Sequence, residues 1–420
     1  MFRRFILITC TILFLFIVYD TISSYPIDGY TYTGIRRLAR LQLVMEGKLK
    51  GTMPAEGARK SILDIKLNLN NARGDSLENF PEINTDLQKK IDAIFPNRHE
   101  SYALALLDIT PGKPVRYAKR MAENRYVPGS VGKLAIAAGL FTELKNLYPD
   151  DTGKRQEVLC SRMVVADKWI VYDSHEIPVY DPETKQYASR AAKEGDVFSL
   201  YEWADHMLSA SANSAASMVW KEVMLMRHFG SSYPPSAEQE KEFFAKTPKT
   251  ELREIAMSVV NDPLRKINIS QNDWQLGSFF TKTGKSIVPG GGGSYATPQG
   301  LLRFLIEMER GKLVDEWSSL EIKRLMYMTA RRIRYASAPA LEKAAVYFKS
   351  GSQYRCKEEP EFKCGKYMGN VENYMNSVAI VEQPDGRIYL VALMSNVLKI
   401  NSAVEHQTLA TYINRAIAKK

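Results

Sequence analysis

The sequence predicts an α/β fold of the α+β sandwich type: a five-stranded antiparallel sheet flanked by helices, with an all-helical subdomain. Two strand patterns lie early in the chain, at residues 102–108 and 115–117, and three lie late, at residues 345–351, 377–382 and 387–394. The residues between these two groups carry mainly helical apolar periods. Strands from both ends of a chain, with helices between them, predict a single sheet that both ends build.

Length and composition fit a globular protein with a large core. At 420 residues the chain can form one large domain or two modest ones. The 57 Lys and Arg residues exceed the 47 Asp and Glu residues, but they are spread along the chain without a basic block. This distribution indicates no nucleic-acid partner. It is compatible with a soluble basic surface or with weak attraction to anionic envelope polymers or lipid.

The N-terminus predicts export. Arg3 and Arg4 precede an apolar run at residues 5–19, which Asp20 ends. The run is intermediate in length between a signal-peptide core and a full membrane span, and no Ala-x-Ala cleavage site follows it. We therefore expect residues 1–24 to be an N-terminal membrane anchor, slightly favoured over a cleaved signal. Because positive flanks stay in the cytoplasm, the rest is expected on the extracytoplasmic, periplasmic face, tethered to the inner membrane.

Cysteine and histidine usage indicates neither a disulfide scaffold nor a metal site. Cys356 and Cys364 flank a short charged segment and can close a loop in an oxidising compartment, but free thiols fit about as well. Cys160 has no evident partner in the sequence. The five histidines are scattered, without a His-Glu-x-x-His or Cys-x-x-Cys pattern, so no metal and no cofactor is expected.

The remaining elements follow in two parts. Residues 25–83 contain one helical pattern, at residues 33–49, and are expected to form an N-terminal appendage with a small structure of its own. Residues 84–420 are expected to form the main domain. Its elements besides the five strands are a helix at 87–94, a strand pair at 169–171 and 177–180, a helical stretch at 197–208, an insertion at 229–296 with at least one helix, and helices at 297–311, 318–331 and 404–418.

Turn and cap residues mark two of these elements most clearly. Thr297 at the N-cap, Pro298 at the first helical position and Gly311 beyond the end delimit one helix. Pro384-Asp-Gly386 separates the last two strands and predicts a hairpin turn.

The stretch around residue 130 carries the first candidate chemistry. A Pro/Gly turn leads into an apolar helix, with Ser130 and Lys133 in its first turn. Residues three apart share a helix face, so the lysine amine is expected beside the serine hydroxyl. Burial lowers the pKa of a lysine, which then can serve as base for a serine nucleophile. Taken alone the pattern is weak, because an N-cap serine followed by a solvent-exposed lysine is common.

Two further motifs follow in order. Ser211-Ala-Asn213 ends a helical stretch, and Lys349-Ser-Gly351 lies on a predicted strand. With the Ser-x-x-Lys pattern, they resemble the three motifs of the serine β-lactamase and penicillin-binding protein superfamily, in the order found there. The resemblance is closest to the class A β-lactamases in layout and covers about residues 84–420. Each motif is weak by itself, whereas all three in order on the expected local structures are specific.

The resemblance implies acyl transfer. Ser130 would attack a carbonyl carbon and become the ester, and Lys133 would accept its proton. Ser211 lies where the leaving nitrogen needs a proton. Backbone N–H groups of Ser130 and Ser352 would form the oxyanion hole.

The resemblance also implies the substrate-binding residues. Asn213 would orient the lysine base and the substrate amide. Lys349 and Ser350 would bind the substrate carboxylate, Gly351 completes the motif, and Lys349 would bias the hydroxyl of the second motif. Each of these residues also has an ordinary structural explanation, such as a helix cap for Asn213 or a strand-edge charge for Lys349.

The chain departs from the class A pattern in two places. The middle residue of the second motif is Ala212, where class A enzymes usually have Asp. Their deacylating Glu lies on a loop after that motif, in a Glu-x-x-Leu-Asn context that this sequence lacks. Glu251 lies in about the right interval and is the candidate base, although two Glu residues three apart on a polar helix are usually a solvated face. Lys282-Thr-Gly284 spells the third motif literally, but no strand pair follows it, so we interpret it as a loop.

These observations predict an exported serine hydrolase that acts through an acyl-enzyme on Ser130. β-Lactam hydrolysis is the expected activity. A D-alanyl-D-alanine carboxypeptidase or transpeptidase acting on peptidoglycan comes next, because an acyl-enzyme without a water-activating base persists. An unrelated amide or ester substrate and a non-catalytic envelope scaffold of the same fold are further alternatives. The expected partners are a β-lactam or peptidoglycan-stem-like substrate and the membrane, with the chain as a monomer.

Overall fold

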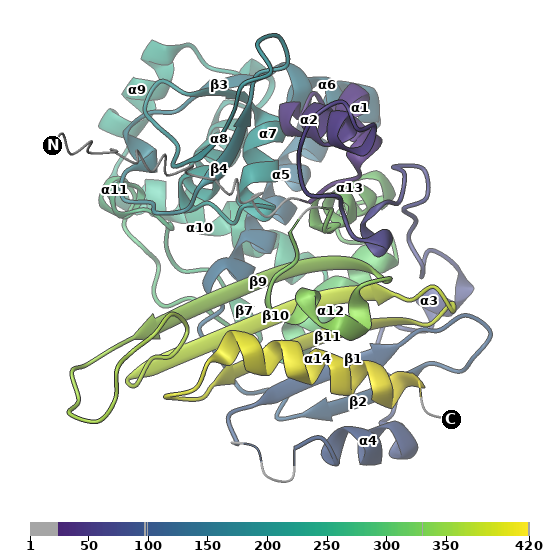
Figure 1. Cartoon of the computed structure of the whole chain (residues 1–420). Helices are drawn as coiled ribbons and strands as arrows, with labels where there is room; N and C mark the ends of the chain where they lie inside the picture. Colours follow the sequence, from purple (N-terminus) through teal and green to yellow (C-terminus); the bar gives the residue numbers. More distant parts are fainter. Residues whose placement is uncertain (1–23, 96–97, 99, 330, 419–420) are drawn as a thin grey trace, which may run out of the picture.

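A five-stranded antiparallel sheet forms the base of the molecule (Figure 1). The computed structural model describes residues 24–95, 98, 100–329 and 331–418. The strands lie in the order β2-β1-β11-β10-β9, which confirms the predicted sheet. Their bounds are β1 (Ala103–Asp108), β2 (Arg116–Arg120), β9 (Ala345–Arg355), β10 (Glu372–Glu382) and β11 (Ile388–Asn396).

Strands β9 and β10 run further than the sequence predicts. They continue beyond the core as a two-stranded arm, in which Arg355 pairs with Glu372. The last four residues of β9 are partly or fully exposed, so no apolar pattern marks them in the sequence. β9 is the outer strand of the sheet.

Helices cover both faces of the sheet, and most of them form a separate helical layer above it (Figure 1). Helices α12, α13 and α14 confirm the three predicted late helices within one or two residues at most ends. The helices after the N-terminal segment are α4 (Thr85–Asp92), α5 (Lys133–Leu147), α6 (Thr152–Ser161), α7 (Leu200–Leu208), α8 (Asn213–Phe229), α9 (Ala237–Lys246), α10 (Lys249–Lys266), α11 (Lys282–Ile287), α12 (Pro298–Glu309), α13 (Glu316–Met326) and α14 (Ser402–Ala418).

The alternation of side chains along the strands decides which helices cover which face. In β1, Leu104 and Leu106 belong to the apolar cluster that α4 and α14 complete. Ala103, Ala105 and Leu107 point to the opposite face and belong to the larger core, which includes α5, α8 and α12. Since both faces are covered, every residue of β1 is buried.

Two predicted elements differ from the structure. Residues 168–170 form a 3₁₀ turn, η4, rather than a strand, because the Asp167 carboxylate accepts a hydrogen bond from the Trp169 N–H and starts the turn. The predicted strand at 177–180 exists as β4 (Ile177–Tyr180), but it pairs with β5 (Tyr187–Arg190). The predicted insertion at residues 229–296 contains α9, α10 and α11, which confirms that it holds at least one helix.

The N-terminal segment is part of the main core rather than an appendage. Leu38 is fully buried in the larger core cluster, as is Tyr25. Arg37 on α2 forms a buried ion pair with Asp205 on α7, with Nη2 and Oδ1 2.6 Å apart. The segment contains η1 (Ile27–Gly29), α1 (Tyr30–Thr33), α2 (Arg36–Met45), η2 (Glu56–Ala58) and α3 (Ala72–Asp75).

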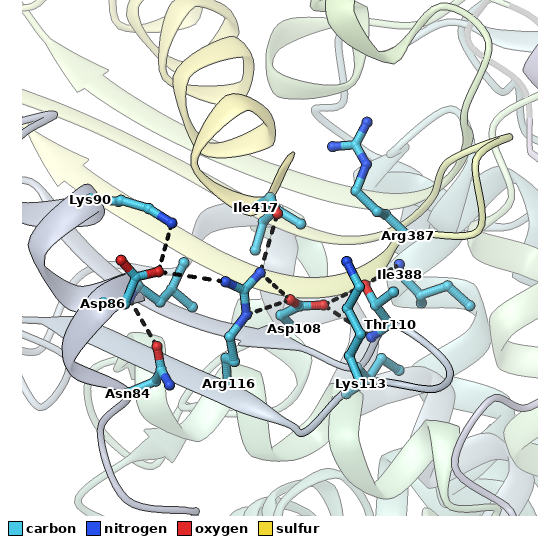
Figure 2. Close-up of polar contacts among 12 residues, drawn as sticks. Asn84, Asp86, Lys90, Asp108, Thr110, Lys113, Arg116, Arg387, Ile388 and Ile417 are labelled. Carbon is cyan, nitrogen blue, oxygen red and sulfur yellow. Dashed lines mark hydrogen bonds and ion pairs between the residues drawn. The ribbon is translucent and has the colours of Figure 1, made fainter. Parts of the chain in front are cut away.

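A polar cluster joins the first hairpin to the last helix (Figure 2). The buried Asp108 carboxylate accepts hydrogen bonds from Arg116 Nε at 2.9 Å and from the Thr110 hydroxyl at 2.6 Å. Arg116 also donates to the carbonyl of Ile417 near the end of α14. The β1–β2 hairpin is therefore held to the C-terminal helix by a satisfied buried charge.

The predictions for the N-terminus and for the cysteines have different outcomes. The predicted anchor at residues 5–19 lies outside the described residues and stays a prediction. Within the described ranges, no helix is long and apolar enough to cross a membrane. Cys356 and Cys364 form a disulfide in the connection between β9 and β10, and Cys160 is a half-buried free thiol.

Candidate active site

Ser130 lies on a 3₁₀ turn, η3 (Gly129–Gly132), which leads directly into α5 at Lys133. Gly129 starts the turn with φ +52°, a conformation that favours glycine. Lys133 Nζ lies 2.9 Å from Ser130 Oγ, which confirms the predicted contact between the two side chains.

Lys133 is fully buried and has three oxygen partners. Besides the Ser130 hydroxyl, its Nζ donates to Asn213 Oδ1 at 2.8 Å and to the carbonyl of Ser211. Burial lowers the pKa of Lys133 to about 7, against an opposing effect of the Asp173 carboxylate. A fraction of the amine is therefore neutral near pH 7 and can accept a proton from Ser130.

Ser211 connects the two lysines of the site. Its backbone is in the left-handed region, with φ +60°, which is uncommon for a serine. Its carbonyl accepts from Lys133, while its hydroxyl accepts from Lys349 Nζ at 2.8 Å. Burial, followed by the positive charges of Lys133 and Arg334, holds the pKa of Lys349 well below its usual range.

Strand β9 approaches the Ser130 turn at Gly351. A methyl group on Gly351 would lie 2.0 Å from the Pro128 carbonyl oxygen and 2.8 Å from the Ser130 nitrogen. Only glycine allows this contact. On the other side, a methyl group on Gly129 would lie 2.9 Å from the Ser352 nitrogen. The backbone nitrogens expected to form the oxyanion hole therefore lie on facing segments.

Arg334 joins the site although the sequence did not point to it. It comes from η6 (Arg334–Ser337), just before β9, and donates to Ser350 Oγ at 2.8 Å and to Ser352 Oγ at 3.1 Å. Its guanidinium lies 4.6 Å from the ring centre of Tyr367, in the connection between β9 and β10. This cation and the two serine hydroxyls form one cluster of hydrogen-bond donors that can bind an anionic group.

A cavity of about 720 Å³ opens over Ser130. Its lining includes four cationic side chains, Lys285, Arg331, Arg334 and Lys366, but one carboxylate, Glu176, among the residues described. The site is therefore electropositive and favours an anionic ligand. In the described part of the chain, no group of three or more His, Cys, Asp and Glu side chains is arranged to hold a metal ion.

Comparison with protein families gives a match to the β-lactamase enzyme family over residues 86–420. The chain belongs to the β-lactamase enzyme family. This membership makes it a hydrolase of the serine β-lactamase and penicillin-binding kind. Comparison of the sequence with curated proteins finds no match.

Solved structures show the same fold at low sequence identity. PBP-A is 13% identical, with a TM-score of 0.50 over 81% of this chain and 100% of that one. A β-lactamase from Chitinophaga pinensis is 15% identical, with a TM-score of 0.50 over 79% of this chain and 98% of that one. The TLA-3 extended-spectrum β-lactamase is 13% identical, with a TM-score of 0.50 over 79% and 96%.

In this member of the β-lactamase enzyme family, the structure does not bring Glu251 to the site. Glu251 is an exposed residue in the first turn of α10 and does not line the cavity. The segment that precedes α12 instead contributes Leu276, Ser278, Phe280 and Lys285 to the lining. Lys282 starts the short helix α11, so the interpretation of Lys282-Thr-Gly284 as a loop is wrong, although the segment is not on a strand.

Sequence reasoning missed three polar residues of the site: Arg334, Asp173 and His175. A basic run at residues 331–334 just before the third motif was a signal for Arg334. Asp173 and His175 lie between η4 and β4, and His175 lines the cavity. No spacing in the sequence relates these two residues to the motifs, because only the tertiary fold brings them together.

Proposed function

We propose that the protein is an exported serine hydrolase that opens β-lactams through an acyl-enzyme on Ser130. The observation that carries this proposal is one hydrogen-bonded path, from the Ser130 hydroxyl through Lys133 and Ser211 to Lys349. This path supplies a nucleophile, a buried amine as its base, and a hydroxyl beside a second amine for the leaving nitrogen. Each group serves one step of amide opening.

The steps follow from these contacts. Ser130 Oγ attacks the lactam carbonyl carbon while Lys133 takes its proton. The developing oxyanion receives hydrogen bonds from the backbone nitrogens of Ser130 and Ser352. The C–N bond then breaks, Ser211 protonates the nitrogen, and the Lys133 ammonium returns the proton it took from Ser130 to the Ser211 oxygen. Lys349 Nζ, hydrogen-bonded to the Ser211 hydroxyl, favours that proton transfer.

Substrate orientation comes from the positive side of the cavity. Arg334, Ser350 and Ser352 form one cluster of donors, and penicillins carry a carboxylate that fits it. Asn213 is held by Lys133 through its Oδ1, which leaves its side-chain N–H₂ to the substrate amide.

A peptidoglycan D-alanyl-D-alanine carboxypeptidase is the second candidate. The observation that favours it is the cavity wall before α12, where no carboxylate lies among the lining residues. Export, tethering by residues 5–19 and a monomeric state are further parts of the proposal and rest on the sequence alone.

A fluorescent penicillin tests the proposal on the purified full-length chain. We expect a covalent label on the wild type, no label on Ser130→Ala, and full label on Ser286→Ala, a serine exposed on α11. Label that decays while a chromogenic cephalosporin is steadily hydrolysed supports the β-lactamase. Label that persists for hours supports the peptidase. A wild type that is never labelled contradicts both.

A further inference from the structure

Asp173 and His175 form a bonded pair at the wall of the cavity. Asp173 Oδ1 lies 2.6 Å from His175 Nδ1 and also accepts from the His175 backbone N–H at 3.0 Å. The Asp173 side chain is only 4% exposed, whereas that of His175 is 38% exposed. The carboxylate is thus buried behind an imidazole that faces the cavity.

The other carboxylate oxygen fixes Asp173 to the second motif. Helix α8 begins at Asn213, and the N-cap residue before it, Ala212, has no side-chain oxygen to accept from the first turn. Asp173 Oδ2 takes that place by accepting from Ser214 N at 2.7 Å and from Ser214 Oγ at 2.9 Å. The pair therefore has a fixed position relative to Asn213, the partner of Lys133.

The hydrogen bonds of Asp173 keep it charged. Although burial acts to raise it, the bonds from His175 and Ser214 hold the pKa of the Asp173 carboxyl well below its usual range. An ionised carboxylate at Nδ1 stabilises the tautomer with its proton on Nδ1. That tautomer leaves a lone pair on Nε2, which has no hydrogen-bond partner among the residues the structure describes.

Few other groups in this cavity can take a proton from water. The wall before α12 contributes Leu276, Ser278, Phe280, Lys285 and Ser294. Glu176 is the one carboxylate in the described lining, and its Oε2 already accepts from the Ser189 hydroxyl at 2.6 Å. Among the described lining residues that follow the second motif in the chain, there is therefore no carboxylate.

We propose that His175, oriented by Asp173, is the general base that hydrolyses the Ser130 ester. As a water oxygen bonds to the ester carbonyl carbon, Nε2 of His175 takes one proton from it. When the intermediate breaks its bond to Ser130 Oγ, the imidazolium returns that proton to Oγ. The products are the free carboxylic acid, the serine hydroxyl and neutral imidazole. This inference rests on the proposed acyl-enzyme.

The test separates ester formation from ester loss in the full-length chain. With the fluorescent penicillin as probe, we expect His175→Ala to form the ester within a few-fold of the wild-type rate but to lose it on the order of 100-fold more slowly. Added imidazole should speed ester loss in His175→Ala and leave the wild type unchanged. His228→Ala, an exposed histidine stacked on Phe243, is the matched control and should behave as wild type.

Asp173 is a positioning residue in this proposal. Asp173→Asn keeps the shape but removes the charge, so it should slow ester loss more than ester formation, with the imidazole of His175 still present. The same measurement on Glu176→Gln identifies the competing base. The proposal is wrong if Glu176→Gln slows ester loss while His175→Ala does not.

Three other outcomes also decide the question. An ester on the wild type that persists for hours contradicts this inference and leaves the proposed acyl-enzyme intact. Equal slowing of both steps in His175→Ala, without rescue by imidazole, indicates a structural role and also overturns it. A wild type that forms no ester contradicts the proposed function itself.

Discussion

At the scale of single residues, the site consists of two buried lysine amines that are hydrogen-bonded to serine residues. Lys133 and Lys349 are both buried, and the Ser211 residue contacts both of them. Burial lowers the pKa of both amines, and the positive charges of Lys133 and Arg334 lower that of Lys349 further. Burial of a lysine destabilises the folded protein, but it also makes the amine neutral near pH 7. A neutral amine can accept the proton of the serine nucleophile.

Ester formation should depend on pH through Lys133. Below a pH of about 7 Lys133 is an ammonium and cannot accept the Ser130 proton, whereas above it the neutral amine dominates. The rate should therefore rise as the pH increases through about 7 and then level off. Rapid-mixing labelling across this range measures it. Lys133→Arg should lose the reaction, because arginine stays protonated, while Lys282→Arg on the exposed part of α11 should keep it. A flat pH profile would contradict this role.

Gly351 should not tolerate a side chain. In Gly351→Ala the new methyl would meet the Pro128 carbonyl at 2.0 Å and the Ser130 nitrogen at 2.8 Å, so β9 or the Ser130 turn must move. We expect ester formation to fall about 100-fold or more, as for loss of an oxyanion donor, with the far-UV circular dichroism retained. Gly293→Ala, where the methyl would meet nothing within 4 Å, is the control. An active Gly351→Ala enzyme would show that this close approach is not needed.

At the scale of elements, the connection between β9 and β10 is a wall of the site as well as a turn. Its disulfide, Cys356–Cys364, closes a short loop. Beyond it, Lys366 and Tyr367 line the cavity, and Tyr367 lies against Arg334. The covalent bridge therefore limits the movement of residues that would touch the substrate.

Removing the disulfide should affect binding more than chemistry. In the double variant Cys356→Ser and Cys364→Ser, we expect KM for a β-lactam to rise several-fold with kcat little changed, because the motif residues lie outside the loop. Stability should fall by about 2 kcal/mol, the usual order for a bridge over a short loop. Steady-state kinetics and thermal unfolding measure both. Cys160→Ser, which removes a free thiol, should change neither, and an unchanged KM in the double variant would exclude the loop from the binding wall.

The elements that sequence reasoning placed well are those whose signal is local. Thr297 accepts a hydrogen bond from Gly300 N at the start of α12, as its Thr-Pro sequence predicts. The turn at Trp169 was mistaken for a strand, because its apolar residues are buried by neighbours distant in sequence. The three motifs were found from their local patterns. Asp173 and Arg334 were not, because Ser214 lies 41 residues from Asp173 and Ser350 lies 16 residues from Arg334, and only packing brings these pairs together.

At the scale of the whole molecule, the residue at which the family match begins does not mark the start of the folded core. The family match starts at residue 86, but the residues before it complete the main core. Tyr25 and Leu38 are buried there, and Arg37 neutralises the buried Asp205. The sequence alone could not predict this packing. The helical pattern in residues 25–83 does not indicate which other elements of the chain these residues contact.

A core residue of this segment should therefore stabilise the whole fold. Leu38→Ala should lower the free energy of unfolding by about 2–5 kcal/mol, as for other buried leucines, in a single cooperative transition. Leu63→Ala, at a side chain 78% exposed, should change it by less than about 0.5 kcal/mol. Denaturant unfolding followed by circular dichroism measures both. A separate early transition in Leu38→Ala would show instead that the segment folds on its own.

The outer strand of the sheet has a consequence for solubility. The start of β9 is covered, with Tyr347 bridged to Tyr327, but further along, from Ser352 to Arg355, its outer edge has no strand beside it in the described chain. Such an edge can pair with an extended peptide or with the same edge of a second molecule. Ser352, Gln353 and Tyr354 of this segment also line the cavity, so a molecule in the cavity and a second strand at this edge would contact the same residues. Protein kept as its penicillin ester should stay clear at concentrations where the free protein becomes turbid.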